Sequence, residues 1–279
     1  MRSRCLCGAV TWQVEGPLAA LSHCHCARCR KAHGAAFASY ALAPEASLRL
    51  DGAAHVAEFA AEGGASRRFC RHCGSVVPPA PERSYVSLPL GNALDDPGVR
   101  PQLHIFVASK APWYEIGDAL PRFDAFPPGV DAAVLPDRPH VHAGDAVHGS
   151  CLCGAVAFEY TGMPILCRHC HCGRCRRGRS AAHATNLGVR LAQLRFTRGE
   201  ELVTLYELPE AKFFAQAFCS RCGGKLPRVD ARRDLAVIPL GALDDDPGVR
   251  PGEHIFVASK APWFEISDAL PRHAEYAPG

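Results

Sequence analysis

The chain has 279 residues, 48% of them apolar and 21% charged, and its formal net charge is +3. This length accommodates two ordinary domains that each bury a core, and the composition is typical of a folded protein. The small net charge does not favour binding to nucleic acid or to an anionic membrane, and no apolar run reaches the length of a membrane span. We therefore expect neither nucleic acid nor a membrane as a partner.

The N-terminal segment "MRSRCLCGAV" has no apolar signal stretch and reaches its first cysteine at position 5. The sequence contains 15 cysteines in all. Without an export signal, so many thiols are expected in a reducing compartment, where they bind metal rather than form disulfides. The expected location is the cytoplasm.

Internal repetition dominates the sequence. The word "HIFVASKAPW" stands at residues 104–113 and again, identical, at 254–263. "CLCGAV" occurs at Cys5 and at Cys151, and "HCHC" occurs at His23 and at His169. Repeats of this length indicate one domain written twice.

The repeated words divide the chain into three segments. We expect a first zinc domain over residues 1–125, a linker over 126–149 and a second zinc domain over 150–279; the two domains are called the first and second repeat below. The linker is rich in Pro and Gly and has no sustained hydrophobic period. Its histidines, His140, His142 and His148, are expected to be solvated.

In chain order, the predicted elements are mostly short strands. Val10, Trp12 and Val14 alternate with polar residues, which is the pattern of a half-buried strand, and the second repeat has the same pattern at 156–160. Further strands are expected at 84–91, 105–107, 235–241 and 255–257. The only expected helices are short ones after Cys29 and after Cys175. The fold class is therefore mainly β, with small antiparallel domains built around metal.

Each repeat carries one C-x-C-G word and one C-x2-C-G word. The two words together supply four thiolates, and the glycines let the backbone turn beneath a metal ion. The spacing predicts a structural zinc site in each repeat that fastens together strands distant in sequence. The predicted ligands are Cys5, Cys7, Cys70 and Cys73 in the first repeat and Cys151, Cys153, Cys219 and Cys222 in the second.

Three cysteines in a C-x-C-x2-C word remain in each repeat. Three thiolates on zinc leave a fourth position open, as in catalytic zinc sites. The candidate catalytic and metal-binding residues are Cys24, Cys26 and Cys29 in the first repeat, with metal-binding counterparts Cys170, Cys172 and Cys175 in the second.

Two other interpretations of the triplet stay open. One is a second structural zinc site completed by His23, His25 or His33, and the other is a redox or iron–sulfur site. If these histidines are not ligands, they are expected to hydrogen-bond to thiolates or to solvent.

Basic residues flank each triplet, and two interpretations apply to them. They can bind the carboxylate of a thiol substrate, or they can form a solvated helix face. They are Arg28, Arg30 and Lys31 in the first repeat and Arg174, Arg176 and Arg177 in the second. Residues 66–68 show no anion-binding pattern.

Five further residues are expected to have structural roles. His104 and His254 belong in the core or in turns, and Trp113 and Trp263 are packing residues. Cys167 has no counterpart in the first repeat and is expected to be a free buried thiol.

The order of the cysteine words, followed by "LDDPGVRP" and "HIFVASKAPW", resembles the glutathione-dependent formaldehyde-activating enzyme family, which includes centromere protein V. The resemblance covers residues 5–123 and 151–274. It implies a β-tent fold of stacked antiparallel sheets with up to two zinc ions per domain, held by the four-cysteine and three-cysteine sets given above. It also implies carbon–sulfur lyase chemistry that interconverts glutathione plus formaldehyde with S-hydroxymethylglutathione.

Three functions are therefore carried forward. The first is a zinc-dependent lyase acting on adducts of a small thiol with an aldehyde. The second is a non-catalytic zinc-binding module that carries a thiol or docks a partner. The third is a metal-buffering or redox-sensing protein, in which mild oxidation would release zinc and pair the triplet cysteines.

The two repeats differ after their triplets, and this difference generates a prediction. The first repeat reads Gly34 to Phe37 in the manner of the family, whereas the second has Ser180 and His183 at the equivalent ends. If only the first repeat is active, Cys26→Ser abolishes lyase activity and Cys172→Ser leaves most of it. Turnover of S-hydroxymethylglutathione by the two variants measures this, and equal losses would contradict it.

Overall fold

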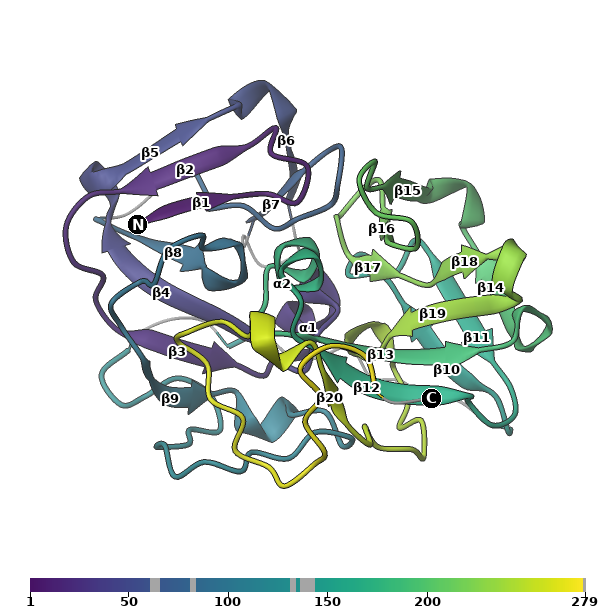
Figure 1. The fold of residues 1–279 in the computed structure, drawn as a ribbon. Coiled ribbons are helices and arrows are strands. Elements are labelled where there is room, and N and C mark those ends of the chain that lie inside the picture. The colour runs from purple at the N-terminus through teal and green to yellow at the C-terminus, as the bar shows by residue number, and fades with distance from the viewer. Residues whose placement is uncertain (61–65, 81–83, 131–133, 136–143, 278–279) are drawn as a thin grey trace.

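The structure is a computed structural model that describes residues 1–60, 66–80, 84–130, 134–135 and 144–277. The described part of the first repeat forms three small sheets (Figure 1). In hydrogen-bonding order these are β1 (Arg2–Arg4), β2 (Thr11–Val14) and β5 (Leu48–Asp51); β8 (Tyr85–Pro89), β4 (Ala38–Pro44), β3 (Leu21–Cys24) and β9 (Pro101–Ile105); and β6 (Val56–Ala60) with β7 (Ser66–Cys70).

The second repeat has the same plan with slightly longer sheets. They are β10 (Val147–Ser150), β11 (Ala157–Tyr160) and β14 (Leu194–Arg198); β18 (Arg228–Asp230), β19 (Leu235–Pro239), β13 (Ala184–Val189), β12 (Leu166–Cys170) and β20 (His254–Ile255); and β15 (Val203–Glu207), β16 (Ala215–Cys219) and β17 (Lys225–Leu226). The mainly β, duplicated fold expected from the sequence is thus confirmed, while the limits of the domains and linker stay predictions.

The alternation predicted around Trp12 matches the packing of β2. Trp12 and Val14 are buried, while Gln13 between them is exposed. The pairs β3–β9 and β12–β20 are parallel, whereas all other strand pairs among the described residues are antiparallel. Each triplet begins at the last residue of a strand, β3 or β12, that lies between an antiparallel and a parallel neighbour.

The strand expected at 105–107 is mostly wrong. β9 ends at Ile105 because Phe106 adopts a left-handed backbone with φ 57°, and residues 107–109 form a 3₁₀ turn. In the second repeat Phe256 does the same with φ 58° after β20. A β-rich apolar run does not reveal such a reversal, because a bulky residue rarely occupies the left-handed region.

The two described α-helices are α1 (Ala27–His33) and α2 (Gly173–Arg179). Both begin before the position expected, because a cysteine of the triplet serves as the N-cap. Cys26 caps α1 and Cys172 caps α2, each accepting a hydrogen bond from the backbone N–H of the third cysteine. No helix in the described part of the chain is long and apolar enough to cross a membrane.

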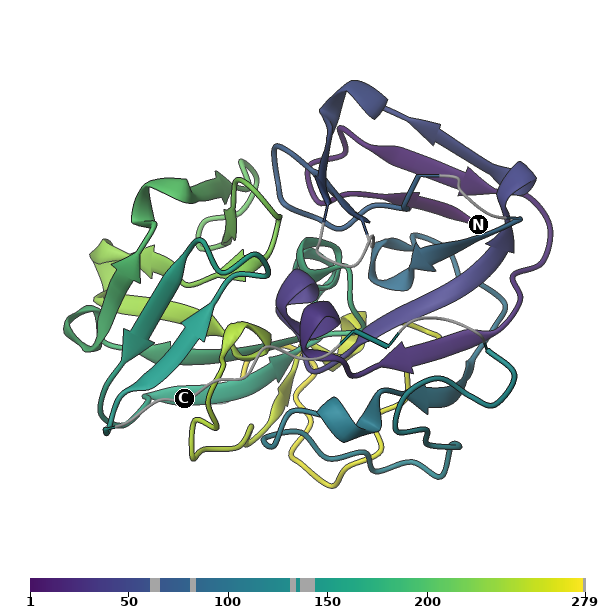
Figure 2. The same cartoon turned by 180° about the vertical axis from the view of Figure 1, so that it is seen from behind.

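Both helices lie at the junction of the two repeats (Figures 1 and 2). Helix α1 packs on the 3₁₀ turn Leu240–Ala242 of the second repeat, and α2 packs on the turn Leu90–Asn92 of the first. The chain segments around the two "APW" words also meet there, with Gly117 close to Ser267. Each repeat therefore contributes a helix that packs on the other repeat, and the two contacts are related by approximate two-fold symmetry.

A reciprocal contact between the C-x2-C-G turns holds the repeats together. A Cβ on Gly74 would lie 2.5 Å from Cγ of Phe218, and a Cβ on Gly223 would lie 2.5 Å from Cγ of Phe69. Buried Lys225 donates to the carbonyls of both glycines, so its ammonium group joins the two turns. These glycines are required both by their positive φ and by the aromatic ring against them.

Two glycine substitutions separate these requirements. Gly74 and Gly98 have nearly the same φ, 71° and 72°, but Gly98 has open space around it. We expect Gly98→Ala to lower the free energy of unfolding by about 1 kcal/mol, and Gly74→Ala by about 3 kcal/mol because overpacking against Phe218 adds to the backbone strain. Denaturant unfolding of the zinc-loaded variants measures both; equal losses would show that the contact between repeats is unimportant.

Candidate metal centres and the cavity beside them

The structure brings each predicted four-cysteine set together. In both sets all four Sγ atoms lie within 4.8 Å of one another. The members come from the loop after β1 or β10 and from the last residue of β7 or β16 and the turn that follows it, so each set joins strands far apart in sequence. The two sets are Cys5, Cys7, Cys70, Cys73 and Cys151, Cys153, Cys219, Cys222.

The spacing within these sets fits a tetrahedral ion. Two thiolates at about 2.3 Å from one zinc ion are about 3.8 Å apart. The Sγ atoms of Cys7 and Cys70 are 3.6 Å apart, and those of Cys153 and Cys219 are 3.9 Å apart. In addition, the backbone N–H of Val10 donates to Sγ of Cys5 at 3.3 Å, a bond that favours a thiolate. These residues can therefore hold a metal ion.

Each triplet also gathers, at the N-terminus of a helix. The three Sγ atoms lie within 4.8 Å of one another, and no His, Asp or Glu among the described residues joins either set. The sequence-based alternative in which a nearby histidine completes a closed site is therefore not supported in the described residues. The triplets are Cys24, Cys26, Cys29 and Cys170, Cys172, Cys175.

In the first repeat a partly buried arginine binds the third cysteine. Arg67, on β7, donates from Nη2 to Sγ of Cys29 at 3.3 Å and from Nη1 to the hydroxyl of Tyr40 at 3.2 Å. The charge of the Cys29 thiolate raises the pKa of Arg67, so the guanidinium stays protonated. The site thus contains a fixed positive charge against its thiolates.

His33 fixes this arginine through Tyr40. Nδ1 of His33 faces the carbonyl oxygens of Arg179 and Ser180 at 2.8 and 3.0 Å, so it carries the proton. Nε2 is then an acceptor, and Tyr40 donates its hydroxyl proton to it at 2.7 Å. Burial lowers the pKa of His33 to about 4, which keeps the ring neutral at physiological pH.

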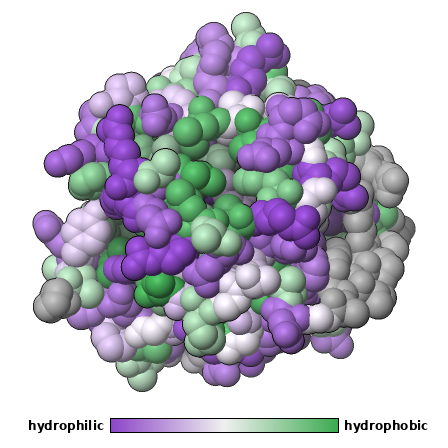
Figure 3. All heavy atoms as spheres, turned by 90° about the vertical axis from the view of Figure 1, so that its right-hand side faces the viewer, coloured by the Kyte–Doolittle hydropathy of each residue, from purple (hydrophilic) through white to green (hydrophobic). Residues whose placement is uncertain are grey.

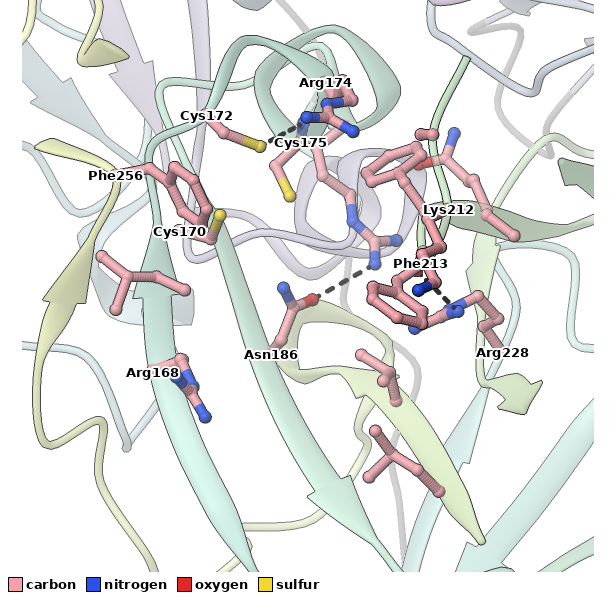
Figure 4. Close-up of a pocket in the computed structure, with 18 of the residues that line it drawn as sticks. Arg168, Cys170, Cys172, Arg174, Cys175, Asn186, Lys212, Phe213, Arg228 and Phe256 are labelled. Carbon is pink, nitrogen blue, oxygen red and sulfur yellow. Dashed lines mark hydrogen bonds between the residues drawn. The ribbon is translucent and has the colours of Figure 1, made fainter. Parts of the chain in front are cut away.

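The second repeat arranges the arginine beside its triplet differently. Gln216 stands at the position of Arg67, Asn186 at that of Tyr40, and Arg179 at that of His33. Arg179 is 9% exposed, and its Nη2 donates weakly to the Asn186 side chain at 3.4 Å. A cavity of about 540 Å³ opens beside this triplet (Figure 4). The cation is therefore supplied by helix α2 here and by strand β7 in the first repeat.

The histidines near the triplets belong to buried chains, which corrects the expectation that they bond to thiolates or solvent. His25 Nε2 and His104 Nδ1 are 2.8 Å apart, and His104 Nε2 lies 3.0 Å from the Asp118 carboxylate. His23 bonds to Ser39 instead. The second repeat has an equivalent series of hydrogen-bonded side chains, formed by His171, His254 and Asp268. His104 and His254 are core residues, as expected.

The structure confirms some of the remaining expectations and corrects others. Trp113 and Trp263 are buried packing residues, as predicted. Cys167 is a free thiol but only half-buried. His148 lies in β10 and is not a solvated linker residue, since its Nδ1 contacts Asp245 at 2.8 Å. His140 and His142 lie outside the described residues.

Lys31 does not fit either interpretation of the basic residues. It is buried, forms an ion pair with Asp244 of the second repeat, and donates to the Ser150 carbonyl at 2.9 Å. It therefore joins the repeats, whereas Arg174 lines the cavity of the second triplet.

No sequence motif identifies Arg67 as a site residue, but a comparison of the two repeats does point to it. The residue lies three positions before Cys70, in a strand with no anion-binding pattern, so no motif marks it. Arg67 corresponds to Gln216 in the second repeat, and His33 corresponds to Arg179. One positive charge therefore lies on a strand in the first repeat and on a helix in the second. Such a compensating exchange within two otherwise similar repeats indicates a charge that the site requires.

This geometry defines a duplicated, mainly β protein with cysteine clusters that can hold metal. Residues 1–109 and 146–259 each match the family described as glutathione-dependent formaldehyde-activating enzyme. The matches cover more than half of the chain, so the chain belongs to this family, as two tandem copies.

A solved structure is also similar to part of the chain. A crystal structure of a Rhodobacter sphaeroides protein from structural genomics is 29% identical, with a TM-score of 0.31, over 37% of this chain and 97% of that chain. No curated protein matches the chain.

The extra histidine of the second repeat predicts a pH dependence of stability. Burial lowers the pKa of His183 to about 3, so below its unfolded pKa of about 6.5 the unfolded chain binds a proton that the folded chain does not. Between pH 7.5 and 5.5 this group alone removes about 1.4 kcal/mol of stability. We expect the His183→Phe variant to lose about 1.4 kcal/mol less free energy of unfolding than the wild type over this range.

The reciprocal substitution is the control. Phe37→His places an imidazole at the equivalent buried position, where the Phe37 and His183 rings are 5.6 Å apart, and should steepen the loss of stability toward pH 5.5. Denaturant unfolding at the two pH values measures both variants. Parallel curves for wild type and His183→Phe would mean that the pKa of His183 is the same in the folded and the unfolded protein.

Proposed function

We propose that the chain is a carbon–sulfur lyase that joins and separates a small thiol, such as glutathione, and an aldehyde, such as formaldehyde. The observation that carries the proposal is the number of ligands in each triplet. Three thiols gather at a helix N-terminus, and among the described residues no further His, Cys or carboxylate completes the set. A position is therefore left for a substrate atom.

Zinc fits both kinds of cysteine set by its preference for thiolates, and at the triplet it would supply a cation that favours the thiolate form of an incoming thiol. We assign the structural role to the four-cysteine sets and the catalytic role to Cys24, Cys26 and Cys29. The proposed setting is the reducing cytoplasm, where the cysteines stay available to metal.

Addition requires little from the protein besides charge and position. The thiol releases its proton to solvent, its sulfur bonds to the carbonyl carbon, and the carbonyl electron pair moves to oxygen, which takes up a proton. The reverse reaction breaks the same carbon–sulfur bond. Negative charge develops on oxygen in both directions, and a fixed donor beside it lowers the barrier.

Arg67 is the donor that the first repeat offers. Its guanidinium is held from two sides, by Cys29 and by Tyr40, so it needs no reorganisation when charge develops. Tyr40 and His33 act as positioning residues. Because His33 is protonated at Nδ1, Tyr40 donates its proton to Nε2 of His33, and the Tyr40 oxygen can accept a hydrogen bond from Arg67. The second repeat has Gln216, Asn186 and Arg179 in these places, which supports assigning the activity to the first repeat.

Zinc analysis and one pair of variants test the proposal. We expect about four zinc ions per purified chain, two in each repeat. We expect Arg67→Gln, which installs the residue of the second repeat, to lower the rate of adduct formation about 100-fold, the effect of removing one such donor. Exchange spectroscopy of formaldehyde and glutathione measures the rate above the uncatalysed background.

Arg68→Gln is the matched control, because Arg68 donates to the Pro78 carbonyl instead of a triplet cysteine. It should retain the wild-type rate. Full zinc content without any acceleration of exchange would favour a non-catalytic zinc-binding module. About two zinc ions per chain would leave only the four-cysteine sets metallated and would overturn the lyase proposal.

A further inference from the structure

Two histidines of the first repeat meet on its surface, next to the four-cysteine set. His55 ends the 3₁₀ turn Ala53–His55 that leads into β6, and His72 lies between Cys70 and Cys73. Nδ1 of His55 and Nε2 of His72 are 2.9 Å apart, and the two ring centroids are 4.9 Å apart. His72 is exposed and His55 is half-buried. Solvent and dissolved ions therefore reach the pair.

The backbone holds the two histidines opposite each other. Strands β6 and β7 are antiparallel and pair Val56 with Cys70. Beyond this pair, the backbone N–H of Arg71 donates to the carbonyl of His55 at 2.9 Å. The guanidinium of Arg71 is engaged with the Val56 carbonyl at 3.0 Å. Rotation of the two imidazole rings, whose terminal torsions are soft, is then enough to turn both nitrogens toward one point.

The separation of the two nitrogens suits a transition-metal ion. Imidazole nitrogens bind such ions at about 2.1 Å, and two of them at a right angle around one ion are about 3.0 Å apart. Right-angled nitrogen ligands are typical of Ni²⁺ and Cu²⁺, whereas the tetrahedral angle of zinc requires about 3.4 Å. In the described part of the chain no carboxylate pairs with either ring. Each neutral ring can therefore direct its one lone pair to an ion and keep its proton on the other nitrogen.

The second repeat has the same backbone arrangement without the imidazoles. The backbone N–H of Ser220 donates to the carbonyl of Leu202 at 2.9 Å, as in the first repeat. Leu202 and Arg221 stand at the positions of His55 and His72. Neither a leucine nor a guanidinium offers a lone pair to a metal cation. The histidine pair is therefore specific to one repeat and is not required by the shared fold.

The pair lies apart from the three-cysteine sites. The cavity beside the second triplet is lined by residues of the second repeat. On the side of the molecule formed by that repeat, hydrophobic side chains gather near the centre and hydrophilic ones surround them (Figure 3). Strand β7 reaches the first triplet near its other end, where Arg67 contacts Cys29. An ion on the histidine pair would therefore leave both triplets free.

We propose that His55 and His72 form a third kind of metal site, which binds one divalent ion of the nickel and copper type. The two imidazoles supply adjacent ligands, and water completes the coordination. The ion joins the turn before β6 to the turn after β7, so it holds together the base of the hairpin that carries Arg67. This inference does not depend on lyase activity, because none of its residues belongs to a triplet.

Calorimetric titration of the zinc-loaded full chain with Ni²⁺ tests the proposal. We expect one Ni²⁺ site per chain, and Co²⁺ should bind the same site more weakly, in the usual order of affinity for nitrogen ligands. Amide hydrogen exchange gives a local measurement. The N–H of Arg71, which bonds to His55, should exchange more slowly when Ni²⁺ is bound, because the ion opposes separation of the two turns.

Variants that copy the second repeat assign the site. His55→Leu and His72→Arg should each weaken Ni²⁺ binding about 100-fold, the gain that a linked second ligand provides. Both side chains reach solvent, so the zinc content should stay that of the wild type. The reciprocal double variant, Leu202→His with Arg221→His, should gain a second Ni²⁺ site.

Replacement of both His140 and His142 by alanine is the matched control, because these linker histidines are also closely spaced in sequence. It should leave the affinity of the site unchanged. A wild-type chain that binds no Ni²⁺, or a site that survives both His55→Leu and His72→Arg, would overturn the proposal. A Ni²⁺ site that depends on both histidines, in a protein without lyase activity, upholds this proposal while the lyase proposal fails.

Discussion

The contact between the two C-x2-C-G turns is the constraint on which the rest of the structure depends. Gly74 and Gly223 each accept the phenylalanine ring of the other repeat, and Lys225 binds both turns from inside. Gln216 adds a second tie, because its side-chain amide donates to the carbonyl of Cys73 at 2.8 Å and to that of Gly178 at 2.6 Å. A metal ion in either four-cysteine set would therefore order the turn that the opposite repeat packs against.

The triplets inherit their geometry from this contact. Strand β7 ends in the turn at Cys70, so fixing that turn also fixes Arg67 against Cys29. On the other side, the carbonyls at the end of α2 hold the tautomer of His33. Each site is thus completed by backbone from the other repeat, and a change at the end of one helix alters the neighbouring site. Arg179, which carries the cation on α2, is also one of the two residues whose carbonyls accept from His33.

The sequence predicts the parts of the fold that depend on local spacing. The grouping of cysteines into four and three follows from the glycine-terminated words, and the burial of Trp12 follows from alternation. The crossing of α1 and α2 between repeats does not follow, because repetition reveals two similar units but not how their surfaces meet. Lys31 illustrates the limit: beside Arg28 and Arg30 it looks like part of a basic surface, yet its partner, Asp244, is remote in sequence and has Leu94 as its counterpart.

The pairing of Lys31 with Asp244 has a consequence for the order of synthesis. Residue 31 leaves the ribosome long before residue 244 exists, and so do Gly74 and Phe69, whose partners are Phe218 and Gly223. While only the first repeat has been synthesised, the ammonium group of Lys31 and the apolar turn at Gly74 are therefore exposed, although both are buried in the complete protein. A neighbouring nascent chain presents the same unfinished surface, so polysomes bring together halves that can pair in the wrong combination. Tethering the two repeats in one chain raises the local concentration of the correct partner, and this favours closure within the chain over exchange between chains.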